Sequence, residues 1–251
     1  MKNASSGAAD GRGTLLLLPA FNEEPSVGAV VRACRSVLPS SEILVVDDGS
    51  SDGTAAAARA AGARVLRLPC NLGVGPAVQT GLQWAVENGF DRVVRLDADG
   101  QHVPAEIPKL LARQRKTGAD LVVGSRFLPA SDFHGSTLAR RFGNYALAKF
   151  LSAVCQARVT DPTSGLWCVR GALLRYFAWE YPCDYPEPEA LALLRRQGYR
   201  FAEAPVRVEP RAHGSSHIRS FGMLYFALRV GLALAADRVR PVNRRFAKGA
   251  G

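Results

Sequence analysis

The sequence lacks paired cysteines, and this excludes two classes of small, cross-linked protein. Its 251 residues include five cysteines, each standing alone, with no CxxC pair and no cluster of cysteine with histidine. Zinc sites and disulfide frameworks need these residues at close, regular spacing. We therefore expect free thiols in a reducing compartment, and neither a structural zinc ion nor a disulfide network.

A long apolar run is also missing near the start of the chain. Residues 1–13 are small and polar, and the apolar stretch Leu15 to Leu18 is too short for a signal peptide. Apolar residues nevertheless make up 47% of the chain, which is enough to bury a core. The expected organisation is a flexible tail over 1–13, one globular domain over 14–217 and a C-terminal segment over 218–251, in a cytoplasmic protein.

Acidic residues are scarce in the C-terminal part. The net charge is +10, and from Arg195 onward twelve Lys and Arg residues face three acidic ones. Residues 221–236 are apolar except for Arg229 and are too few to span a bilayer comfortably. We interpret them as an apolar or amphipathic helix, lying either in the membrane interface or in the core. The charge favours an anionic partner, such as the cytoplasmic face of a membrane or a lipid phosphate, and by itself also allows nucleic acid.

Short apolar runs alternate with helical patterns through the first half of the chain. Strands are expected at Thr14 to Pro19, Glu42 to Val46, Arg64 to Leu68, Arg92 to Leu96 and Asp120 to Val123. Helices are expected at Val27 to Val37, Thr54 to Ala61, Val74 to Glu87 and, beyond a less regular stretch, Ala190 to Arg196. The short connections indicate βαβ units and predict an α/β fold with a mainly parallel sheet flanked by helices.

Polar clusters follow three of the expected strands. They are Asn22 with Glu23, Asp47 with Asp48, and Asp97 with Asp99. Ligands of such sheets bind beyond the carboxyl ends of the strands, so the three clusters are expected to converge. Because adjacent carboxylates repel each other, Asp47 and Asp48 imply a compensating ligand or hydrogen-bond donor, and one of them is expected to bind a nucleoside.

Asp97 and Asp99 predict a metal site. Alternate positions of an extended segment share one side, so the two carboxylates are expected to point the same way. Together they suit Mg²⁺ or Mn²⁺, which fill their remaining positions with diphosphate oxygens and water, and Gln101 adds a third candidate oxygen. An isolated Asp-Ala-Asp-Gly sequence is equally compatible with a solvated turn. The neighbouring acidic strand ends and the arginines that follow favour the metal.

Several short motifs occur in the order found in one enzyme family. They are Pro19 to Glu24, Val45 to Thr54, Asn71 to Gly73, Asp97 to Gln101, Gly124 to Arg126 and Asp161 to Gly165. Together they resemble the family 2 glycosyltransferases, and within that family the polyprenyl- and dolichol-phosphate mannose or glucose synthases. The resemblance covers about Leu15 to Ile218 and implies a GT-A fold and inversion at the anomeric carbon of the sugar.

The resemblance also implies roles for individual residues. The nucleotide sugar is bound by Pro19, Ala20, Phe21, Glu23, Asp47, Asp97, Ala98, Asp99 and Arg126, and the metal by Asp97, Asp99 and Gln101. The acceptor phosphate is bound by Arg140, Arg141, Ser216 and His217. His217 stands where the family often has lysine, so its phosphate role is weaker at neutral pH and a surface role is the alternative. The catalytic candidates are Asp99, Arg126, Arg140, Arg141, Asp161, Glu187 and Glu189.

The nature of the acceptor decides whether a base is needed. A lipid phosphate is already ionised, whereas a sugar hydroxyl must lose its proton to a carboxylate such as Asp161, Glu187 or Glu189. The alternative for Asp161 is a turn at Asp161-Pro162, and for the two glutamates it is the acidic first turn of a helix. The expected function is metal-assisted transfer of a hexose from a GDP-mannose or UDP-glucose type of donor to polyprenyl phosphate. A saccharide acceptor is the alternative, and a non-catalytic membrane or nucleic-acid binding module leaves the acidic strand ends unexplained.

Overall fold

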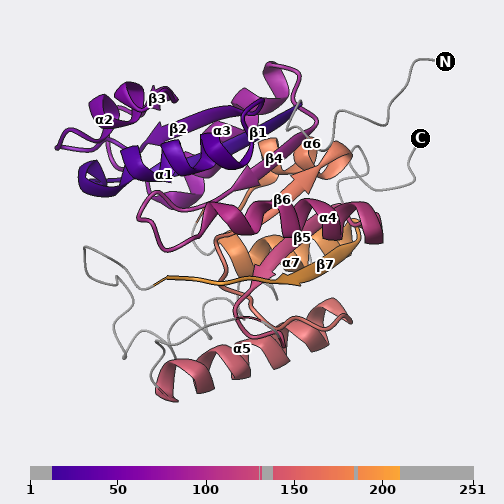
Figure 1. Cartoon of the computed structure of the whole chain (residues 1–251). Coiled ribbons are helices and arrows are strands. Elements are labelled where there is room, and N and C mark those ends of the chain that lie inside the picture. Colours follow the sequence, from indigo (N-terminus) through magenta and orange to yellow (C-terminus); the bar gives the residue numbers. More distant parts are fainter. Residues whose placement is uncertain (1–12, 130, 132–137, 184–185, 210–251) are drawn as a thin grey trace.

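One seven-stranded sheet forms the centre of the molecule (Figure 1). The structure is a computed structural model that describes residues 13–129, 131, 138–183 and 186–209; the side chains of 138–142 and 195–196 are not described. The strand order is β3-β2-β1-β4-β6-β5-β7. The strands are β1 (Thr14–Ala20), β2 (Glu42–Asp47), β3 (Arg64–Arg67), β4 (Arg92–Arg95), β5 (Leu121–Ser125), β6 (Trp167–Arg170) and β7 (Phe201–Pro205).

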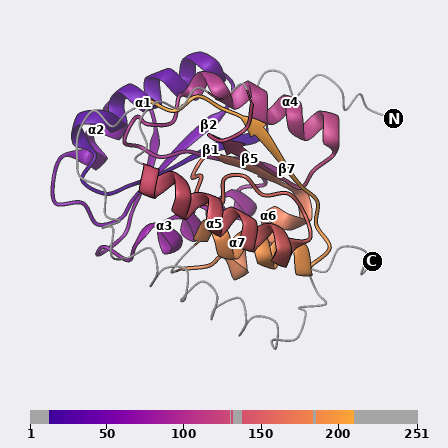
Figure 2. The same cartoon turned by 90° about the horizontal axis from the view of Figure 1, so that it is seen from below.

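Helices cover both faces of the sheet (Figure 2). One face packs against α1 (Glu24–Val37), α2 (Thr54–Ala60) and α4 (Ile107–Thr117), the last preceded by a 3₁₀ turn at Pro104–Glu106. The other packs against α3 (Val74–Glu87), α5 (Leu138–Cys155), α6 (Gly171–Glu180) and α7 (Pro186–Arg196). This three-layer arrangement is the α/β fold with a mostly parallel sheet that the sequence predicts.

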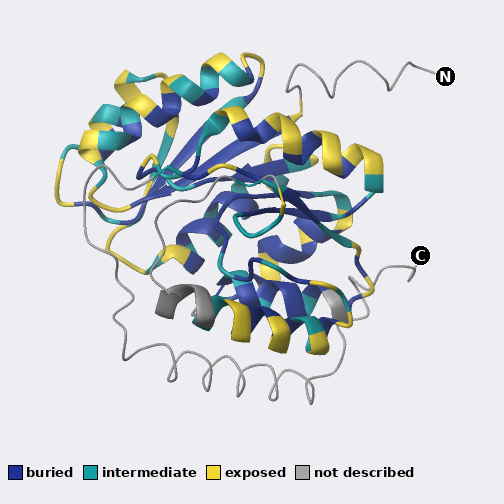
Figure 3. Ribbon diagram, turned by 60° about the horizontal axis from the view of Figure 1, so that its bottom comes forward, coloured by how far each residue is buried: buried dark blue, intermediate teal, exposed yellow. Residues whose placement is uncertain are grey.

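The central strands are apolar throughout because both of their faces are covered. All seven residues of β1 are buried, and its side chains alternate between the two cores. Leu15 and Leu17 face α3 and α6, whereas Leu16 and Leu18 face α1 and α4. Such continuous apolar runs are typical of parallel strands buried on both sides. The dark core of the sheet in Figure 3 reflects this pattern.

The chain beyond β4 contains elements that the sequence pattern did not predict. They are α4, α5 and α6, with the strands β6 and β7. β6 pairs antiparallel with both of its neighbours, β4 and β5, whereas β5 and β7 pair in parallel. A strand of four residues that reverses the sheet direction leaves too short a pattern to identify from periodicity.

No helix within the described residues is long and apolar enough to cross a membrane. The predicted helix over 221–236 lies outside the described residues, as do Ser216 and His217.

The five cysteines are free thiols, as predicted, and they differ sharply in exposure. Burial raises the pKa of Cys34 and Cys168 to about 12, which suppresses the reactive thiolate. We expect a thiol reagent at mildly alkaline pH to label the exposed Cys70 and Cys183 in the native protein. Buried Cys34, Cys155 and Cys168 should react only after unfolding in guanidinium. Peptide mass spectrometry distinguishes the sites, and native labelling of Cys168 as fast as that of Cys70 would contradict the packing.

Candidate functional site

Three polar loops meet at the carboxyl ends of β1, β2 and β4. β1 lies between the other two strands, which confirms the predicted convergence. The Asn22 amide donates to the Ser50 hydroxyl, and the Ser51 amide donates to Asn22 Oδ1, both at 2.9 Å. The Glu23 amide donates to the Thr54 hydroxyl at 2.8 Å. These bonds join the loops after β1 and β2 into one surface.

Asp47 and Asp48 have different environments. The two oxygens of Asp48 accept from the backbone amides of Leu72 and Gly73, each at 2.8 Å, directly before α3. Asp47 Oδ1 accepts from a backbone amide of its own loop, but its buried Oδ2 has no hydrogen-bond partner among the described residues and lies 3.4 Å from Arg67 Nε. Asp48 therefore shapes the loop, whereas Asp47 has one oxygen that is paired with Arg67 but, within the described part of the chain, not hydrogen-bonded.

The backbone around Asp97 and Asp99 differs from the sequence prediction. The sequence places both residues on an extended segment, but β4 ends at Arg95 and residues 98–99 form a turn, so that prediction is wrong. The physical reason is local. The Asp97 amide donates to His102 Nδ1 at 3.0 Å and not to a neighbouring strand, so the chain leaves the sheet there.

His102 supports this turn through a hydrogen bond. Its Nδ1 accepts from the Asp97 amide at 3.0 Å, as the tautomer without a proton on that nitrogen can do. Burial lowers the pKa of His102, the charge of Asp97 opposes this effect, and the charges of Arg95 and Arg126 add to it. His102 Nδ1 also lies 3.2 Å from Asp97 Oδ2. His102 positions the turn through its hydrogen bond.

The turn is held by hydrogen bonds to residues 208–209, which follow β7. Asp99 is 6% exposed, and its Oδ1 accepts from the Gln101 amide at 3.0 Å. The Glu209 amide donates to the Gln101 carbonyl at 2.9 Å, and His102 forms a β-bridge with Val208. The predicted metal set is thus held from two sides.

Arg95 is buried beside Asp97, with 3% of its side chain exposed. Its Nη2 lies 2.6 Å from Asp97 Oδ1, and its Nη1 lies 3.6 Å from Glu187 Oε1. A guanidinium in this environment stays charged, and Asp97 and Glu187 both raise its pKa against the effect of burial. Arg95 therefore links a carboxylate of the β4 loop with one on α7.

Arg126 and Asp161 form a bidentate ion pair on the loops that follow β5 and precede β6. Arg126 Nε and Nη2 donate to the two oxygens of Asp161, each at 2.7 Å, and the Arg126 amide donates to the same carboxylate at 3.0 Å. Arg126 Nη2 also donates to the Thr163 hydroxyl at 2.8 Å. The Asp161 side chain is fully buried. Asp161 therefore orients the Arg126 side chain. The sequence analysis considered only a turn at Asp161-Pro162 or a catalytic base.

A second carboxylate, Glu203 on β7, supports Asp161. Its Oε1 accepts from the amides of Thr160 at 2.8 Å and Asp161 at 3.1 Å, and its Oε2 accepts from the Thr160 hydroxyl at 2.8 Å. Burial raises the pKa of Glu203, and these hydrogen bonds oppose the rise. Glu203 holds the loop that carries Asp161.

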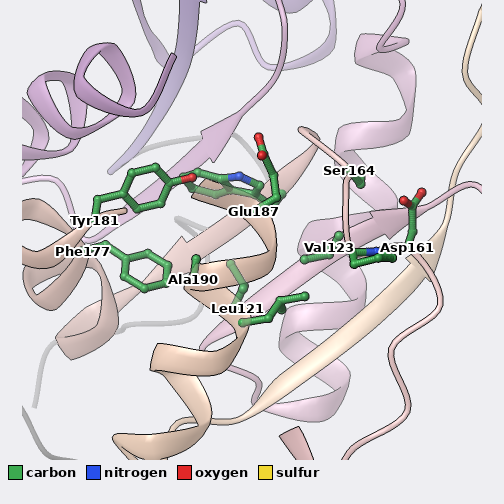
Figure 4. Close-up of a pocket in the computed structure, with 11 residues that line it drawn as sticks. Leu121, Val123, Asp161, Ser164, Phe177, Tyr181, Glu187 and Ala190 are labelled. Carbon is green, nitrogen blue, oxygen red and sulfur yellow. The ribbon is translucent and has the colours of Figure 1, made fainter. Parts of the chain in front are cut away.

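A pocket opens between β5, β6, α6 and α7. Figure 4 shows Tyr181 and Glu187 on one side of it and Asp161 on the other. Burial raises the pKa of Glu187, an effect that Arg95 opposes. Burial and the Glu187 charge raise the pKa of Tyr181, which therefore stays protonated and hydrogen-bonds with the Trp167 side chain.

The remaining predicted residues fall into three groups. Pro19, Ala20 and Ala98 are buried, whereas Phe21 is 40% exposed beside them on the loop after β1. Glu187 and Glu189 lie in the first turn of α7, as the helix-start alternative predicts, and Glu187 in addition reaches Arg95. Arg140 and Arg141 lie in the first turn of α5, and their side chains are outside the described residues.

The charges around Asp97 fit a divalent cation. Among the described residues, Arg95 lies beside both Asp97 and Glu187, and the charges of the same two carboxylates also act on Arg126. In the described part of the chain, no three His, Cys, Asp or Glu side chains gather closely enough to bind a metal ion by themselves. A cation here would thus complete its coordination with substrate oxygens and water, as Mg²⁺ and Mn²⁺ commonly do.

Sequence reasoning missed Arg95, His102 and Glu203. A signal existed for Arg95, since it is a charged residue next to Val93 and Val94 in an apolar strand. His102 directly follows the metal motif. Glu203 lies in a strand that was not predicted, so its sequence carried no usable signal.

The chain belongs to glycosyl transferase family 2, whose family model matches residues 16–181. It is therefore a glycosyltransferase enzyme, and its fold is like that of the GT-A glycosyltransferases.

Three similar proteins illustrate the relationship. An undecaprenyl-phosphate mannosyltransferase of Micrococcus luteus is 33% identical over 80% of this chain and 86% of its own. A UDP-N-acetylglucosamine–dolichyl-phosphate N-acetylglucosaminyltransferase of Methanococcus voltae is 27% identical over 88% of this chain and 97% of its own. The glucosyl-3-phosphoglycerate synthase of Mycobacterium tuberculosis, in complex with Mn²⁺, UDP and glucosyl-3-phosphoglycerate, matches with TM-score 0.68 and 26% identity, over 92% of this chain and 82% of that one.

Proposed function

We propose that this glycosyltransferase moves a hexose from a nucleoside diphosphate sugar to polyprenyl phosphate, with inversion and with the help of Mg²⁺ or Mn²⁺. The observation that carries the proposal is the gathering of the carboxylates Asp97 and Asp99 on one turn, at the edge where the loops after β1, β2 and β4 meet. Carboxylate oxygens of this kind would suit a divalent cation that also binds a diphosphate. Two relatives whose names include a lipid phosphate support the acceptor class.

The donor extends from β2 toward the turn after β4 in this proposal. Asp47 Oδ2 accepts from the nucleoside, and the loop of Pro19, Ala20, Phe21 and Glu23 lies beside it. Asp97, Asp99 and Gln101 would hold the cation, which would act as a Lewis acid and stabilise the departing diphosphate. Arg126, aimed by Asp161, contributes a fixed positive charge on the other side.

A lipid phosphate acceptor is consistent with this site because it needs no strong base. Its oxygen is already ionised and attacks the anomeric carbon as the bond to the diphosphate breaks. Arg140 and Arg141, in the first turn of α5, and Ser216 with His217 are proposed to bind the acceptor phosphate.

A hydroxyl acceptor is the second candidate, and a specific observation supports it. Burial raises the pKa of Glu187, which faces the pocket, toward the range in which a carboxylate accepts a proton effectively. The similar solved enzyme makes glucosyl-3-phosphoglycerate. In this case Glu187 takes the hydroxyl proton.

A panel that varies both the sugar donor and the acceptor tests the proposal. The purified enzyme is incubated with Mn²⁺ or Mg²⁺ and with GDP-mannose, UDP-glucose or UDP-GlcNAc, and each donor is offered polyprenyl phosphate or a soluble hydroxyl acceptor. A glycolipid product, lost when EDTA is added, is the expected result. Transfer only to the soluble acceptor would replace the first candidate with the second, and turnover unaffected by EDTA would overturn the metal role.

Contact with an anionic bilayer is proposed as part of this function. Tyr145 and Phe150 on α5 are 59% and 43% exposed, and Lys149 Nζ lies 5.5 Å from the Tyr145 ring. Residues 138–158 contain four Lys and Arg residues and no Asp or Glu. Asn144 Nδ2 donates to the Thr160 carbonyl at 3.2 Å, so α5 is also tied to the loop that carries Asp161. Figure 3 shows exposed turns along this helix.

Removing the two exposed aromatic rings should weaken binding to vesicles. We expect the double variant Tyr145→Ser, Phe150→Ser to bind phosphatidylglycerol vesicles about tenfold more weakly in co-sedimentation, because each ring buries apolar surface at the interface. Trp179→Ser is the matched control, since Trp179 is 60% exposed on α6. Equal losses in the control and the double variant would exclude α5 as the membrane surface.

A further inference from the structure

Arg95 occupies a core position of the sheet. Val93, two residues earlier on β4, packs in the core formed with α3, α6 and α7, and the alternation of side chains puts Arg95 on the same face. Its partners on the neighbouring strands are Leu17 and Trp167, both buried in that core. A guanidinium at such a place requires a reason, because burying a charge opposes folding unless it is well paired.

The pairing of Arg95 is incomplete and directional. Nη2 makes a close contact with Asp97 Oδ1, but Nε and Nη1 have no hydrogen-bond partner in the described part of the chain. Nη1 instead points toward Glu187 Oε1, 3.6 Å away. A group optimised for stability alone would satisfy these buried donors. The Arg95 guanidinium thus lies between the carboxylates of Asp97 and Glu187 and contacts only one of them closely.

Gly165 leaves the space that the guanidinium fills. A Cβ built at Gly165 would overlap Arg95 Nη1 and would lie within 2.9 Å of Asp97 Oδ2. The backbone of the loop between Asp161 and β6 therefore closes over the Arg95–Asp97 pair. Any larger residue at 165 would have to displace one of the two side chains.

We propose that Arg95 is a positioning residue that sets the Asp97 carboxylate for the cation and the donor diphosphate and ties it to Glu187 on the acceptor side. The inference rests on the proposed function, since it assigns Asp97 to that cation. Arg95 touches neither substrate nor cation. Its role is to hold the carboxylates of Asp97 and Glu187 at a fixed separation before the donor binds. Without Arg95, their mutual repulsion would drive them further apart.

Arginine suits this role better than lysine or an apolar residue. Its planar fork presents two N–H groups in fixed directions, so one can face Asp97 while the other faces Glu187. A single ammonium can favour one carboxylate only. An apolar residue of similar length would fill the core but leave the carboxylates uncompensated.

Two separate measurements distinguish function from stability. Removing one partner of a buried ion pair leaves the other charge uncompensated, so Arg95→Met should lower the midpoint of thermal unfolding. The affinity of the protein that remains folded for Mn²⁺ with UDP or GDP should fall as well. Supporting residues around metal ligands typically change affinity by about 10- to 100-fold, and we expect a loss in that range.

The experiment measures Mn²⁺ binding by electron paramagnetic resonance, with Mn²⁺ alone and with UDP or GDP, together with thermal unfolding and kinetics. Arg95→Met and Arg95→Lys are compared with Arg92→Met, on the same strand, where Arg92 Nε donates to Gln114 Oε1. Gly165→Ala provides a second test because its Cβ would overlap Arg95 Nη1 without changing Arg95 itself. We expect Arg95→Met and Gly165→Ala to weaken Mn²⁺–nucleotide binding, Arg95→Lys to do so less, and Arg92→Met to leave it unchanged.

The outcomes distinguish the two levels of the proposal. If the unaltered protein binds no Mn²⁺ with either nucleotide, the proposed metal-assisted function fails. If it binds them and Arg95→Met binds equally well, the role of Arg95 is wrong while the proposed function stands. Loss of binding only in proportion to loss of folded protein would assign Arg95 to the core alone.

Discussion

Asp99→Asn is expected to lower kcat by a factor on the order of 10³ while the protein stays folded. Asparagine keeps the shape of the side chain and an oxygen that can still accept from the Gln101 amide, so the turn is preserved. What is lost is a negative charge in a 6% exposed position, where a cation is bound most strongly. Without the cation, the charge that develops on the leaving diphosphate is no longer stabilised.

The measurement is product formation at saturating donor and metal, with circular dichroism to establish folding. Asp91→Asn is the matched control, because Asp91 is an exposed carboxylate at the opposite end of the same strand. Activity within about twofold of the unaltered protein is expected for this control, since exposed groups outside a site contribute little. Retained activity in Asp99→Asn, or an equal loss in Asp91→Asn, would exclude the metal role of Asp99.

Arg126→Ala is expected to lower kcat by about 10²- to 10³-fold, because it removes a fixed positive charge beside the departing diphosphate. The same substitution leaves Asp161 buried without its partner, so some loss of stability is also expected. Asp161→Asn should have a smaller effect on kcat, since it misdirects Arg126 but does not remove it. The double variant should then be no worse than Arg126→Ala, because both changes affect one unit.

Steady-state kinetics and thermal unfolding on the three variants test this dependence. Arg59→Ala, an exposed arginine at the end of α2, controls for the loss of positive charge in general. Multiplicative losses in the double variant would show that Asp161 acts independently of Arg126, as a catalytic group in its own right.

The parallel half of the fold was predictable because short apolar runs alternate regularly with helical patterns there. Apolar runs followed by Gly- and Asp-rich turns predicted β1, β2 and β4 with an error of one residue at an end. The helical pattern between two such runs predicted both ends of α3 correctly. Convergence of the loops follows from strand order in a parallel sheet, and it was predicted for the same reason.

The connections within the site could not be predicted from sequence. Which member of the Asp47 and Asp48 pair is held by the protein itself depends on the backbone of Leu72 and Gly73, which only the folded loop brings to Asp48. The partnership of Arg126 with Asp161 likewise joins residues far apart in the chain. Sequence motifs identify such residues as members of a set but do not state which pairs with which.

The reversed strand β6 has a consequence for biosynthesis. β1, β2, β3 and β4 precede β6 in the chain, so the ribosome synthesises them first. The open edge of β4, with Arg95 at its end, must wait for Trp167 and Gly165, which are synthesised later. Because β6 runs antiparallel, its first residues lie at the edge where the loops after β1, β2 and β4 meet. The buried guanidinium is therefore enclosed only when the reversed strand docks.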